Sequence, residues 1–315
     1  MGKNLSVTPA RYKSEFPWLK EVDSLALCNA QMHHFFHDVS VGFPKFRSKK
    51  KPVKSYTTNC VNGNTVLQNG RLKLPKAGWV RIRQHRKIEE GYQLKGATIT
   101  QEADERYYVA LLYSCEEPVN EIRKAESAIG LDFSMKELYV DSNGNRAAYP
   151  HFFSKAQKKL AREQRKLSRC VKESRNYVRQ KKKVARCHEK IRNQRRDYLH
   201  KLSRRITDQY DIVAVEDIDM KAMSQCMHFG KSVMDNGYGK FRELLEYKLT
   251  WRGKKLVRVD RFFPSSKKCC KCGSVKKELK LSDRVYFCTC GNRIDRDLNA
   301  AINIREEARR MLLAG

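Results

Sequence analysis

The feature that most constrains this sequence is a pair of cysteine motifs near its C-terminal end. Cys269-x-x-Cys272 and Cys288-x-Cys290 are separated by fifteen residues. Two close cysteine pairs at this separation are typical of a zinc ribbon, in which two knuckles hold one tetrahedral zinc ion. We therefore predict a structural zinc site, with the stretch 263–291 folded around it.

Carboxylates follow the predicted ribbon directly. Asp295 and Asp297 precede an apolar, alanine-rich segment that is typical of the start of a helix. The second knuckle is one residue shorter than the common Cys-x-x-Cys, and Cys270 is an alternative to Cys269 as a ligand. We expect zinc to bind with either ligand set. The ribbon therefore delivers two carboxylates to the N-terminus of a helix.

Charge narrows the class of partner. The 315 residues include 66 lysines and arginines against 35 acidic residues, a net charge of +31. Such an excess opposes compact folding unless a polyanion neutralises it, and nucleic acid is the expected polyanion. The alternative is a membrane surface, but we find no apolar run of about 18 residues and no basic amphipathic anchor, and we expect no signal peptide. Six of the eleven cysteines are scattered singly, which fits a reducing cytoplasm rather than a disulfide framework.

The N-terminal segment is predicted to hold one amphipathic helix followed by a basic linker. Apolar residues recur at helical spacing from Val22 to Phe36, with Met32 on the stripe, and Asp23 or Ser24 is the candidate cap. Three histidines at the end of this helix form either a metal site or a set of imidazoles suited to the helix dipole: His33, His34 and His37. We prefer the second interpretation.

Residues 55–120 are predicted to form six short antiparallel strands in a small barrel or sandwich. Asn69-Gly70, between two of these strands, is a strong hairpin signal. Basic residues are interleaved with Trp79, Tyr107 and Tyr108, a mixture that suits phosphate contacts and base stacking. For any single residue here we prefer the alternative, an ordinary solvated sheet face.

Two apolar runs further along the chain are predicted to be buried strands that end in carboxylates. AIGL precedes Asp132, and IVAV precedes Glu216. Two returning strands follow the first run, and a helix at 241–247 and a strand at 255–259 follow the second. A lone carboxylate after a strand is often only a turn former, so neither position identifies a site by itself.

Residues 154–206 are predicted to form a basic helical hairpin that bends near Ser174. Positions 155–205 contain 21 lysines and arginines against four acidic residues, a net charge of +17. Leu160, Leu167 and Val171 are expected to form the apolar stripe of its first arm. A charged run is usually a solvated face, but here the balancing acids are missing, so we favour a groove for a polyanion.

These elements predict a chemistry when they are assembled. In a mixed α/β sheet, strand ends and helix starts meet along one edge, so Asp132, Glu216 and Asp297 are expected to share a cleft. Three carboxylates in a dry cleft need cations, and hard oxygen ligands select magnesium or manganese. Two such ions could activate a water and stabilise the leaving oxygen of a phosphodiester. This is the two-metal arrangement of a nuclease.

Three motifs carry a resemblance to a known family. IGLDFS, VAVEDID and IDRDLNAAINI are similar to the RuvC-like (ribonuclease H-type) motifs of TnpB, the transposon-encoded RNA-guided nuclease related to type V CRISPR effectors. Further similar stretches, such as FPWLKEVDSLAL and FFPSSKKCCKCG, run almost the length of the chain. The resemblance implies a catalytic triad of Asp132, Glu216 and Asp297, supported by Asp295. It also implies the zinc ligands Cys269, Cys272, Cys288 and Cys290.

The fold and partners implied by the resemblance extend to the whole chain. The implied fold class is α/β plus β: a RuvC-like mixed-sheet nuclease domain with an inserted zinc ribbon, preceded by a small OB-like β-barrel and a short helical segment. The implied domains are the recognition segment with its linker, the guide-RNA-binding barrel, the two parts of the nuclease domain and the ribbon that binds target nucleic acid: 1–54, 55–120, 121–262 with 292–315, and 263–291. The expected cofactors are structural Zn²⁺ and catalytic Mg²⁺ or Mn²⁺.

The partners implied by the resemblance are nucleic acids. They are a guide RNA from the transposon end and double-stranded and single-stranded DNA, with base pairing reading the target sequence. No membrane partner is expected, association with the element's transposase is a further hypothesis, and the expected location is the nucleoid in a prokaryotic cytoplasm.

One departure from the family pattern defines the alternatives. Only fifteen residues precede Phe16, where the family usually has a further basic strand and helices, so we expect an N-terminally shortened lobe. The first hypothesis is an active RNA-guided DNA endonuclease. The alternatives are an RNA- and DNA-binding repressor, a truncated copy without cleavage activity and, more weakly, direct strand transfer. The three carboxylates favour the first hypothesis, because a protein that only binds has no physical reason to keep them.

Overall fold

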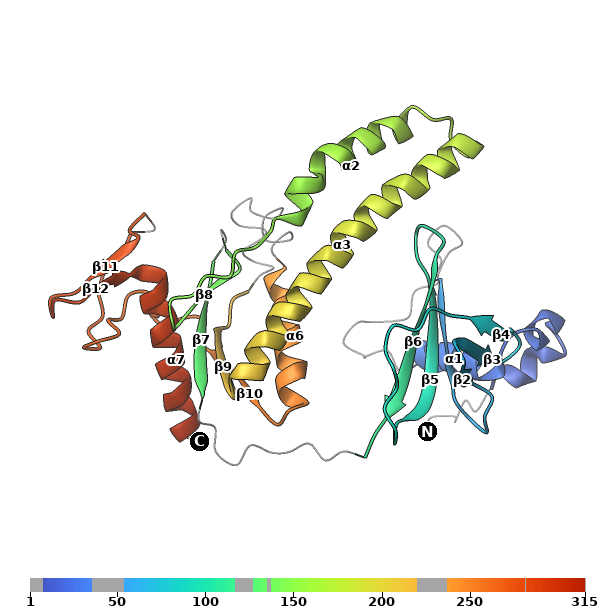
Figure 1. The fold of residues 1–315 in the computed structure, drawn as a ribbon, viewed down its shortest axis with the longest axis horizontal. Coiled ribbons are helices and arrows are strands. Elements are labelled where there is room, and N and C mark those ends of the chain that lie inside the picture. Colours follow the sequence, from blue (N-terminus) through green and yellow to red (C-terminus); the bar gives the residue numbers. More distant parts are fainter. Residues whose placement is uncertain are drawn as a thin grey trace, which may run out of the picture. The chain divides into compact units, whose positions relative to one another are not determined.

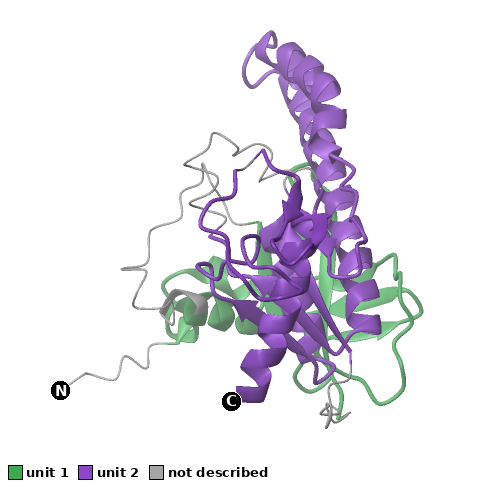
Figure 2. Ribbon diagram, turned by 90° about the vertical axis from the view of Figure 1, so that its left-hand side faces the viewer, with its two compact units in different colours: residues 1–117 green, residues 118–315 purple. Residues whose placement is uncertain are grey.

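The computed structural model describes residues 8–35, 54–116, 127–134, 137–219, 237–280 and 282–314, without the side chains of 33–35. The chain divides into two compact units (Figure 2): unit 1, Met1–Glu117, and unit 2, Pro118–Gly315. None of the helices in these described ranges is long and apolar enough to cross a membrane. The histidines predicted as a cluster near position 33 lie outside the described side chains.

Unit 1 begins with helical segments. They are two short 3-10 helices and one α-helix: η1 (Pro9–Lys13), η2 (Pro17–Lys20) and α1 (Ser24–Phe35). Asp23 caps α1 as predicted, because its Oδ1 accepts a hydrogen bond from the backbone N–H of Leu25 at 3.1 Å. The predicted apolar stripe is wrong at Met32, which is 55% exposed. Asn29 instead attaches the helix to the first strand, donating through Nδ2 to the carbonyl oxygen of Thr57 at 2.9 Å.

Unit 1 continues with six strands, all at the predicted places. They form two antiparallel sheets of three strands, in the order β1 (Ser55–Asn59), β5 (Gln93–Gln101), β6 (Tyr107–Ser114) and β2 (Val66–Gln68), β3 (Arg71–Leu74), β4 (Gly78–Arg81). Leu72 and Leu74 of one sheet and Ala97 of the other share a buried core. Asn69 and Gly70 both have positive φ, at 49° and 69°, as a two-residue hairpin of this sequence requires.

Unit 2 is built on a mixed sheet of four strands (Figure 1). Their order is β10 (Lys255–Val259), β9 (Ile212–Glu216), β7 (Ala128–Phe133) and β8 (Tyr139–Asp141). The first three strands are parallel, and β8 returns antiparallel to β7. The second returning strand that we predicted is reduced to a single bridge between Val140 and Arg146. Parallel strands are buried on both faces, which explains why their sequences are nearly continuous apolar runs.

Helices cover both faces of this sheet (Figure 1). One face is covered by α3 (Arg175–Gln209) and α6 (Tyr238–Thr250), and the other by α7 (Arg296–Ala314). Alternate residues of each strand serve the two faces. Val213 and Val215 of β9 pack in the core with α3 and α6, whereas Ala214 packs in the core that contains Ile304 and Ala308 of α7. By the same alternation, Asp132 and Glu216 belong to the face of the sheet that α7 covers.

A helical hairpin projects from this unit. Its arms are α2 (Phe152–Ser168) and α3, joined by a turn at 169–174. Ser174 caps α3 by accepting a hydrogen bond at Oγ from the backbone N–H of Tyr177 at 3.1 Å, which agrees with the predicted bend. Val171, predicted on the apolar stripe, is 78% exposed because it lies in this turn rather than in the helix. Gln180 of α3 joins the arms, donating through Nε2 to the Glu163 carboxylate at 2.8 Å.

Candidate active site and metal centre

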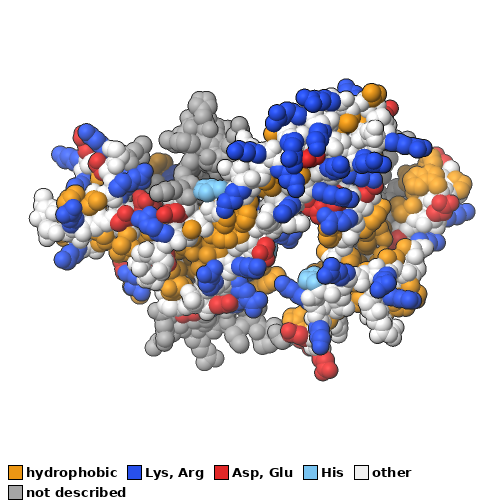
Figure 3. Space-filling view, turned by 45° about the horizontal axis from the view of Figure 1, so that its top comes forward, with side chains coloured by type: hydrophobic (Ala, Val, Ile, Leu, Met, Phe, Trp, Pro, Cys, Tyr) orange, Lys and Arg blue, Asp and Glu red, His pale blue; other side chains and the backbone are white. Residues whose placement is uncertain are grey.

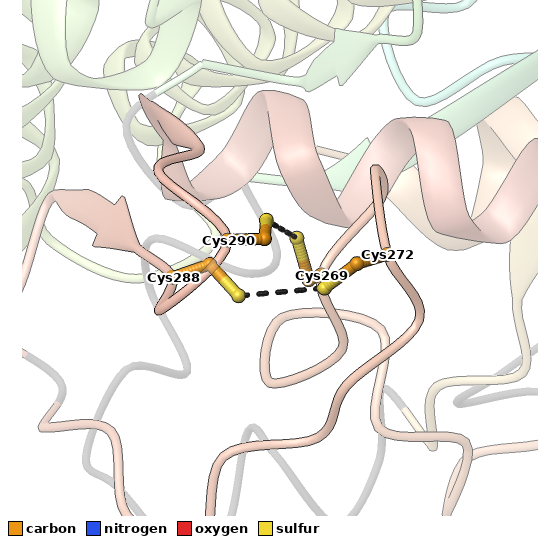
Figure 4. A group of neighbouring side chains, drawn as sticks. All are labelled: Cys269, Cys272, Cys288 and Cys290. Carbon is orange, nitrogen blue, oxygen red and sulfur yellow. Dashed lines mark hydrogen bonds between the residues drawn. The ribbon is translucent and has the colours of Figure 1, made fainter.

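The four predicted zinc ligands lie together in the C-terminal part of unit 2. The ligand atoms of Cys269, Cys272, Cys288 and Cys290 all lie within 4.8 Å of one another, and Figure 4 shows the thiols facing a common centre. Sγ of Cys269 is 3.8 Å from that of Cys290, and Sγ of Cys272 is 3.5 Å from that of Cys288. A tetrahedral zinc ion with Zn–S bonds of about 2.3 Å has S···S edges of about 3.8 Å. The cluster therefore fits a structural zinc site.

Backbone turns on either side position these thiols. The second knuckle is the turn between β11 (Val285–Phe287) and β12 (Arg293–Asp295), a two-stranded antiparallel ribbon. The backbone N–H of Cys290 donates to the Cys288 thiol, as does the hydroxyl of Ser274, and together they lower the pKa of Cys288 to about 5. A thiolate is therefore favoured at Cys288 at neutral pH, and the thiolate is the form that binds zinc.

Cys270 is not part of the cluster. Burial raises the pKa of the Cys270 thiol, which keeps it protonated. Its backbone N–H donates to Oδ1 of Asn299 at 3.0 Å, and its sulfur accepts a hydrogen bond from Nδ2 of Asn292 at 3.6 Å. Of the two ligand sets that the sequence allowed, the structure supports the one with Cys269.

The three predicted carboxylates come from three neighbouring elements of unit 2. Asp132 lies near the carboxyl end of β7, Glu216 ends β9, and Asp297 is in the first turn of α7. Strands β7 and β9 are paired in parallel up to Leu131 and Val215, so the two strand carboxylates are the next residues of adjacent strands at the same sheet edge. All three side chains are partly buried.

Electrostatics indicate that the three carboxylates influence one another. Burial raises the pKa of Asp132 well above its ordinary value, and the negative charges of Asp297 and Glu216 raise it further. The guanidinium of Arg296 opposes this effect. Burial also raises the pKa of Glu216. Asp132 and Glu216 are therefore both penalised for being charged, and a bound cation would stabilise their charged forms.

The carboxylates are nevertheless arranged more loosely than the thiols. Among the residues that the structure describes, the four cysteines are the only group of three or more metal-ligating side chains within 4.8 Å of one another. The Arg296 guanidinium is beside the carboxylates instead, with Nη2 at 3.3 Å from Oδ1 of Asp297. Convergence at one sheet edge is therefore observed, whereas a preformed metal cage is not.

Asp295 has a supporting role in this arrangement. Its Oδ1 accepts hydrogen bonds from the backbone N–H groups of Asp297 and Leu298, each at 3.0 Å, so it is the N-cap of α7. Its Oδ2 is 2.9 Å from Nη2 of Arg146, which also pairs with Glu137 at 2.9 Å. These contacts hold the first turn of α7, and with it Asp297, at the sheet edge.

Sequence reasoning missed two residues of this region. Arg146 binds Asp295 across 149 positions of sequence, a distance over which no local pattern gives a signal. Tyr238, at the start of α6, is fully buried and its hydroxyl has no hydrogen-bond partner in the described structure. Burial raises the pKa of this phenol, and the negative charges of Asp132 and Glu216 contribute, so a neutral donor lies near the carboxylates. The only available signal was a tyrosine opening the helix after the Glu216 strand.

Two family models match consecutive stretches of the chain, which together cover the last residues of unit 1 and most of unit 2. Residues 111–227 match the family described as "Probable transposase", and residues 238–304 match the "Cas12f1-like, TNB domain". The first match contains Asp132 and Glu216, and the second contains Asp297 and the four clustered cysteines.

Similarity to individual proteins covers nearly the whole chain. A protein of Streptomyces pristinaespiralis named "Putative RNA-guided DNA endonuclease" is 34% identical over 308 residues, which cover 95% of this chain and 75% of the relative. "Putative RNA-guided DNA endonuclease InsQ" of Escherichia coli (strain K12) is 31% identical over 324 residues, covering 96% and 79%. A solved structure, the "Cryo-EM structure of the Cas12f1-sgRNA-target DNA complex", aligns with 68% of this chain and 46% of that chain, at 18% identity and a TM-score of 0.48.

The two family matches and the fold together define the class: a chain that matches the probable-transposase family, with a mixed α/β sheet, three carboxylates at one sheet edge and an adjoining cysteine ribbon that matches the Cas12f1-like domain. More particularly, the chain belongs to the TnpB family.

Proposed function

We propose that this protein is an RNA-guided, divalent-metal-dependent DNA endonuclease whose unit 2 is a RuvC-like (ribonuclease H-type) nuclease domain. The observation that carries the proposal is the convergence of Asp132, Glu216 and Asp297 at one edge of the mixed sheet. The relatives named as RNA-guided DNA endonucleases support the same activity. The mixed sheet, with one antiparallel strand beside three parallel strands, is compatible with the expected nuclease fold.

The donor set of the proposed active site fits magnesium or manganese. All three residues offer carboxylate oxygens, and hard oxygen ligands select these ions over zinc or copper. The raised pKa of Asp132 indicates a site that a cation would stabilise, and the buried, unpartnered hydroxyl of Tyr238 indicates that a polar partner could be accepted there. When bound, two such ions would supply the Lewis acidity that activates a water and stabilises the leaving oxygen of a phosphodiester.

The protein's own residues would hold and orient this centre. Asp132 and Glu216 are fixed by adjacent paired strands, and Asp297 by the capped first turn of α7. Arg296 would exchange its contact with Asp297 for a phosphate oxygen of the substrate, because a guanidinium favours phosphate as well as carboxylate. The backbone to be cut would therefore be held against the sheet edge from the α7 side.

The basic hairpin is the proposed binding surface for a nucleic-acid backbone. Figure 3 shows lysine and arginine side chains gathered over it. Between the arms lies a groove of about 610 Å³, lined by Phe152 and Ile191 as apolar residues and by six cations: Lys155, Lys159, Lys166, Lys183, Arg186 and Lys190. Few acids balance these charges, so the groove is suited to phosphates.

Unit 1 is the proposed guide-RNA-binding lobe, with an OB-like arrangement of its two sheets. Trp79 and Tyr107 are large aromatics that remain about half or more exposed, at 49% and 69%. Basic residues lie beside Trp79: Arg81 is on the same strand, and Lys73 of β3 is paired in register with Trp79. Exposed rings beside cations suit stacked bases and their phosphates.

The test compares two neighbouring carboxylates at the end of β9. Glu216→Gln should reduce magnesium-dependent cleavage of a target plasmid on the order of a thousandfold or more, because it removes a metal ligand from the transition state. Asp217→Asn is the matched control, since Asp217 is the next residue but pairs with Arg242 and Arg261 instead. The protein is expressed with its flanking DNA so that bound RNA co-purifies and is sequenced. Equal cleavage by wild type and Glu216→Gln would refute the assignment, and a specific bound RNA without cleavage would favour the RNA- and DNA-binding alternative.

A further inference from the structure

Two buried asparagines of α7 hold the first zinc knuckle by its backbone. Asn299 and Asn303 lie one helical turn apart and are almost fully buried. Nδ2 of Asn299 donates to the carbonyl oxygen of Lys268 at 2.7 Å, and Nδ2 of Asn303 donates to the same oxygen at 2.6 Å. Lys268 directly precedes the ligand Cys269. The helix therefore contacts the chain next to the first sulfur.

The same two side chains also bind the backbone on both sides of that position. Oδ1 of Asn299 accepts the backbone N–H of Cys270 at 3.0 Å, and Nδ2 of Asn303 also donates to the carbonyl oxygen of Ser265 at 2.8 Å. Buried amides that lose such partners cost free energy, so the knuckle and this side of the helix stabilise each other. A zinc ion that orders the knuckle would consequently order this side of α7.

The ribbon is attached to the start of α7 as well. Asp295 is the last residue of β12 and caps the helix through the backbone N–H groups of Asp297 and Leu298. Asn299 follows Asp297 by two residues. The first turn of α7 is thus held by the ribbon at its end and along its side, and the carboxylate of Asp297 belongs to that turn.

We propose that Asn299 and Asn303 are positioning residues that couple zinc occupancy of the cysteine cluster to the placement of Asp297 in the carboxylate site. The effect of this coupling on cleavage rests on the proposed nuclease function, whereas the coupling between the two sites is a property of the fold. It makes zinc binding and divalent-metal binding at the carboxylates thermodynamically linked, so each raises the affinity for the other by the same factor. The hydrogen bonds described for the two asparagines go to the knuckle backbone rather than to the thiols or the carboxylates that would hold the ions.

The first measurement is hydrogen exchange of the full-length protein with and without zinc. Stripping zinc should speed exchange of the amides at 297–304 about tenfold, while those of β9 stay protected. Asn303→Leu, which keeps the branched shape of the side chain but removes both N–H donors, should show the fast exchange even when zinc is bound. Asn299→Leu provides a second variant if the first fails to fold. Thr207→Val, an equally buried polar-to-apolar change on α3, is the control and should leave exchange in α7 unchanged.

The second measurement is the affinity for Mn²⁺, read by electron paramagnetic resonance of the zinc-loaded and zinc-stripped protein. In the wild type, stripping zinc should weaken Mn²⁺ binding about tenfold, and in either asparagine variant this ratio should fall to near one. Equal Mn²⁺ affinity with and without zinc in the wild type, together with unchanged exchange in α7, would overturn the coupling. Mn²⁺ binding that is the same in wild type and Asp132→Asn would instead contradict the proposed active site, while the exchange result still decides the coupling.

Discussion

Gly130 of β7 lies against the backbone of Ala301 in α7, so closely that a Cβ atom at position 130 would stand 2.1 Å from the carbonyl oxygen of Ala301. Only a residue without a side chain allows the helix to approach the strand at this distance. Gly130 is two residues before Asp132, and Ala301 is four residues after Asp297. The contact therefore sets the spacing between a strand carboxylate and the helix carboxylate.

Gly130→Ala should destabilise unit 2 by about 3 kcal/mol, because backbone atoms cannot move aside as a flexible side chain can. The measurement is chemical denaturation of the purified protein. Gly239→Ala is the matched control: a Cβ there meets nothing within 4 Å, and alanine in a helix stabilises by up to about 1 kcal/mol. If Gly130→Ala unfolds at the same denaturant concentration as the wild type, the close approach of α7 to β7 is incorrect.

The pH dependence of stability tests the carboxylate group. The pKa of Asp132 is raised in the folded protein and returns to about 4 on unfolding. Between about pH 4 and the raised pKa of Asp132, the folded protein keeps a proton that the unfolded chain has lost, so the free energy of unfolding falls as pH rises. In magnesium-free buffer at a pH above the raised pKa of Asp132, Asp132→Asn should therefore be more stable than the wild type. The difference in stability should vanish as pH falls towards 4.

Asp211, at the other end of the β9 strand, provides a control of opposite sign. Burial alone would raise the pKa of Asp211, but hydrogen bonds from Ser127 and the ion pair with Lys254 lower it. Its contribution to stability is present above the ordinary aspartate pKa and is lost as pH falls through the lowered value. Asp211→Asn should accordingly be less stable than the wild type at neutral pH. The same sign for both variants would contradict the assigned environments.

The sequence was sufficient for the parts of the fold that follow from local patterns. The strands of unit 2 were predicted because apolar runs such as AIGL and IVAV are typical of buried strands, and those of unit 1 because short strand-like runs alternate with turn signals such as Asn69-Gly70. The carboxylates that follow AIGL and IVAV consequently lie at the sheet edge. The bend predicted near Ser174 is confirmed, and the structure adds the cap that Ser174 provides. The predicted burial of Met32 and Val171 was wrong because a periodic pattern does not show where a helix face becomes exposed, as at Met32, or where a helix ends in a turn, as at Val171.

The rest of the site depends on contacts between distant residues. The pair Arg146–Asp295 and the buried hydroxyl of Tyr238 arise only after the sheet, α6 and the ribbon have assembled. The choice of Cys269 over Cys270 depends on which of two adjacent side chains points towards the second knuckle, and only the sulfur of Cys269 joins the cluster of four. Spacing alone leaves both ligands possible.

The cap of α7 makes a graded prediction. Asp295→Ala should lower stability by about 1 kcal/mol and reduce the cleavage rate without abolishing it, because Asp297 remains present but its turn loses two hydrogen bonds. Asp295→Ser, which restores a capping oxygen without the charge that pairs with Arg146, should recover most of the stability. Complete loss of cleavage in Asp295→Ser would indicate that Asp295 itself holds a metal ion.

Substitutions of the adjacent residues Cys269 and Cys270 distinguish a zinc ligand from a cysteine that does not bind the ion. Cys269→Ser should lower the zinc content of the purified protein, measured by inductively coupled plasma mass spectrometry, and destabilise the ribbon, because three thiols hold zinc less well than four. Cys270→Ser should retain zinc, since its sulfur lies outside the cluster and its backbone contact to Asn299 is unchanged. The reverse pattern of zinc contents would show that Cys270 is the ligand.

Salt dependence distinguishes a phosphate groove from a merely solvated basic face. If the α2–α3 groove contacts the nucleic-acid backbone, the triple change Lys183→Gln, Arg186→Gln and Lys190→Gln removes up to three phosphate contacts. The slope of log K against log salt should then fall in magnitude by about 0.9 for each contact on duplex DNA, or about 0.7 on single strands.

A control for this experiment lies on α7. Arg309→Gln with Arg310→Gln also removes positive charge, but both arginines pair with acids of their own helix, Glu306 and Glu307. Because each is already neutralised locally, the slope should stay close to that of the wild type. An equal decrease for both sets of variants would mean that affinity depends on net charge alone. The hairpin would then not be a specific binding surface for the phosphate backbone of the guide or the target.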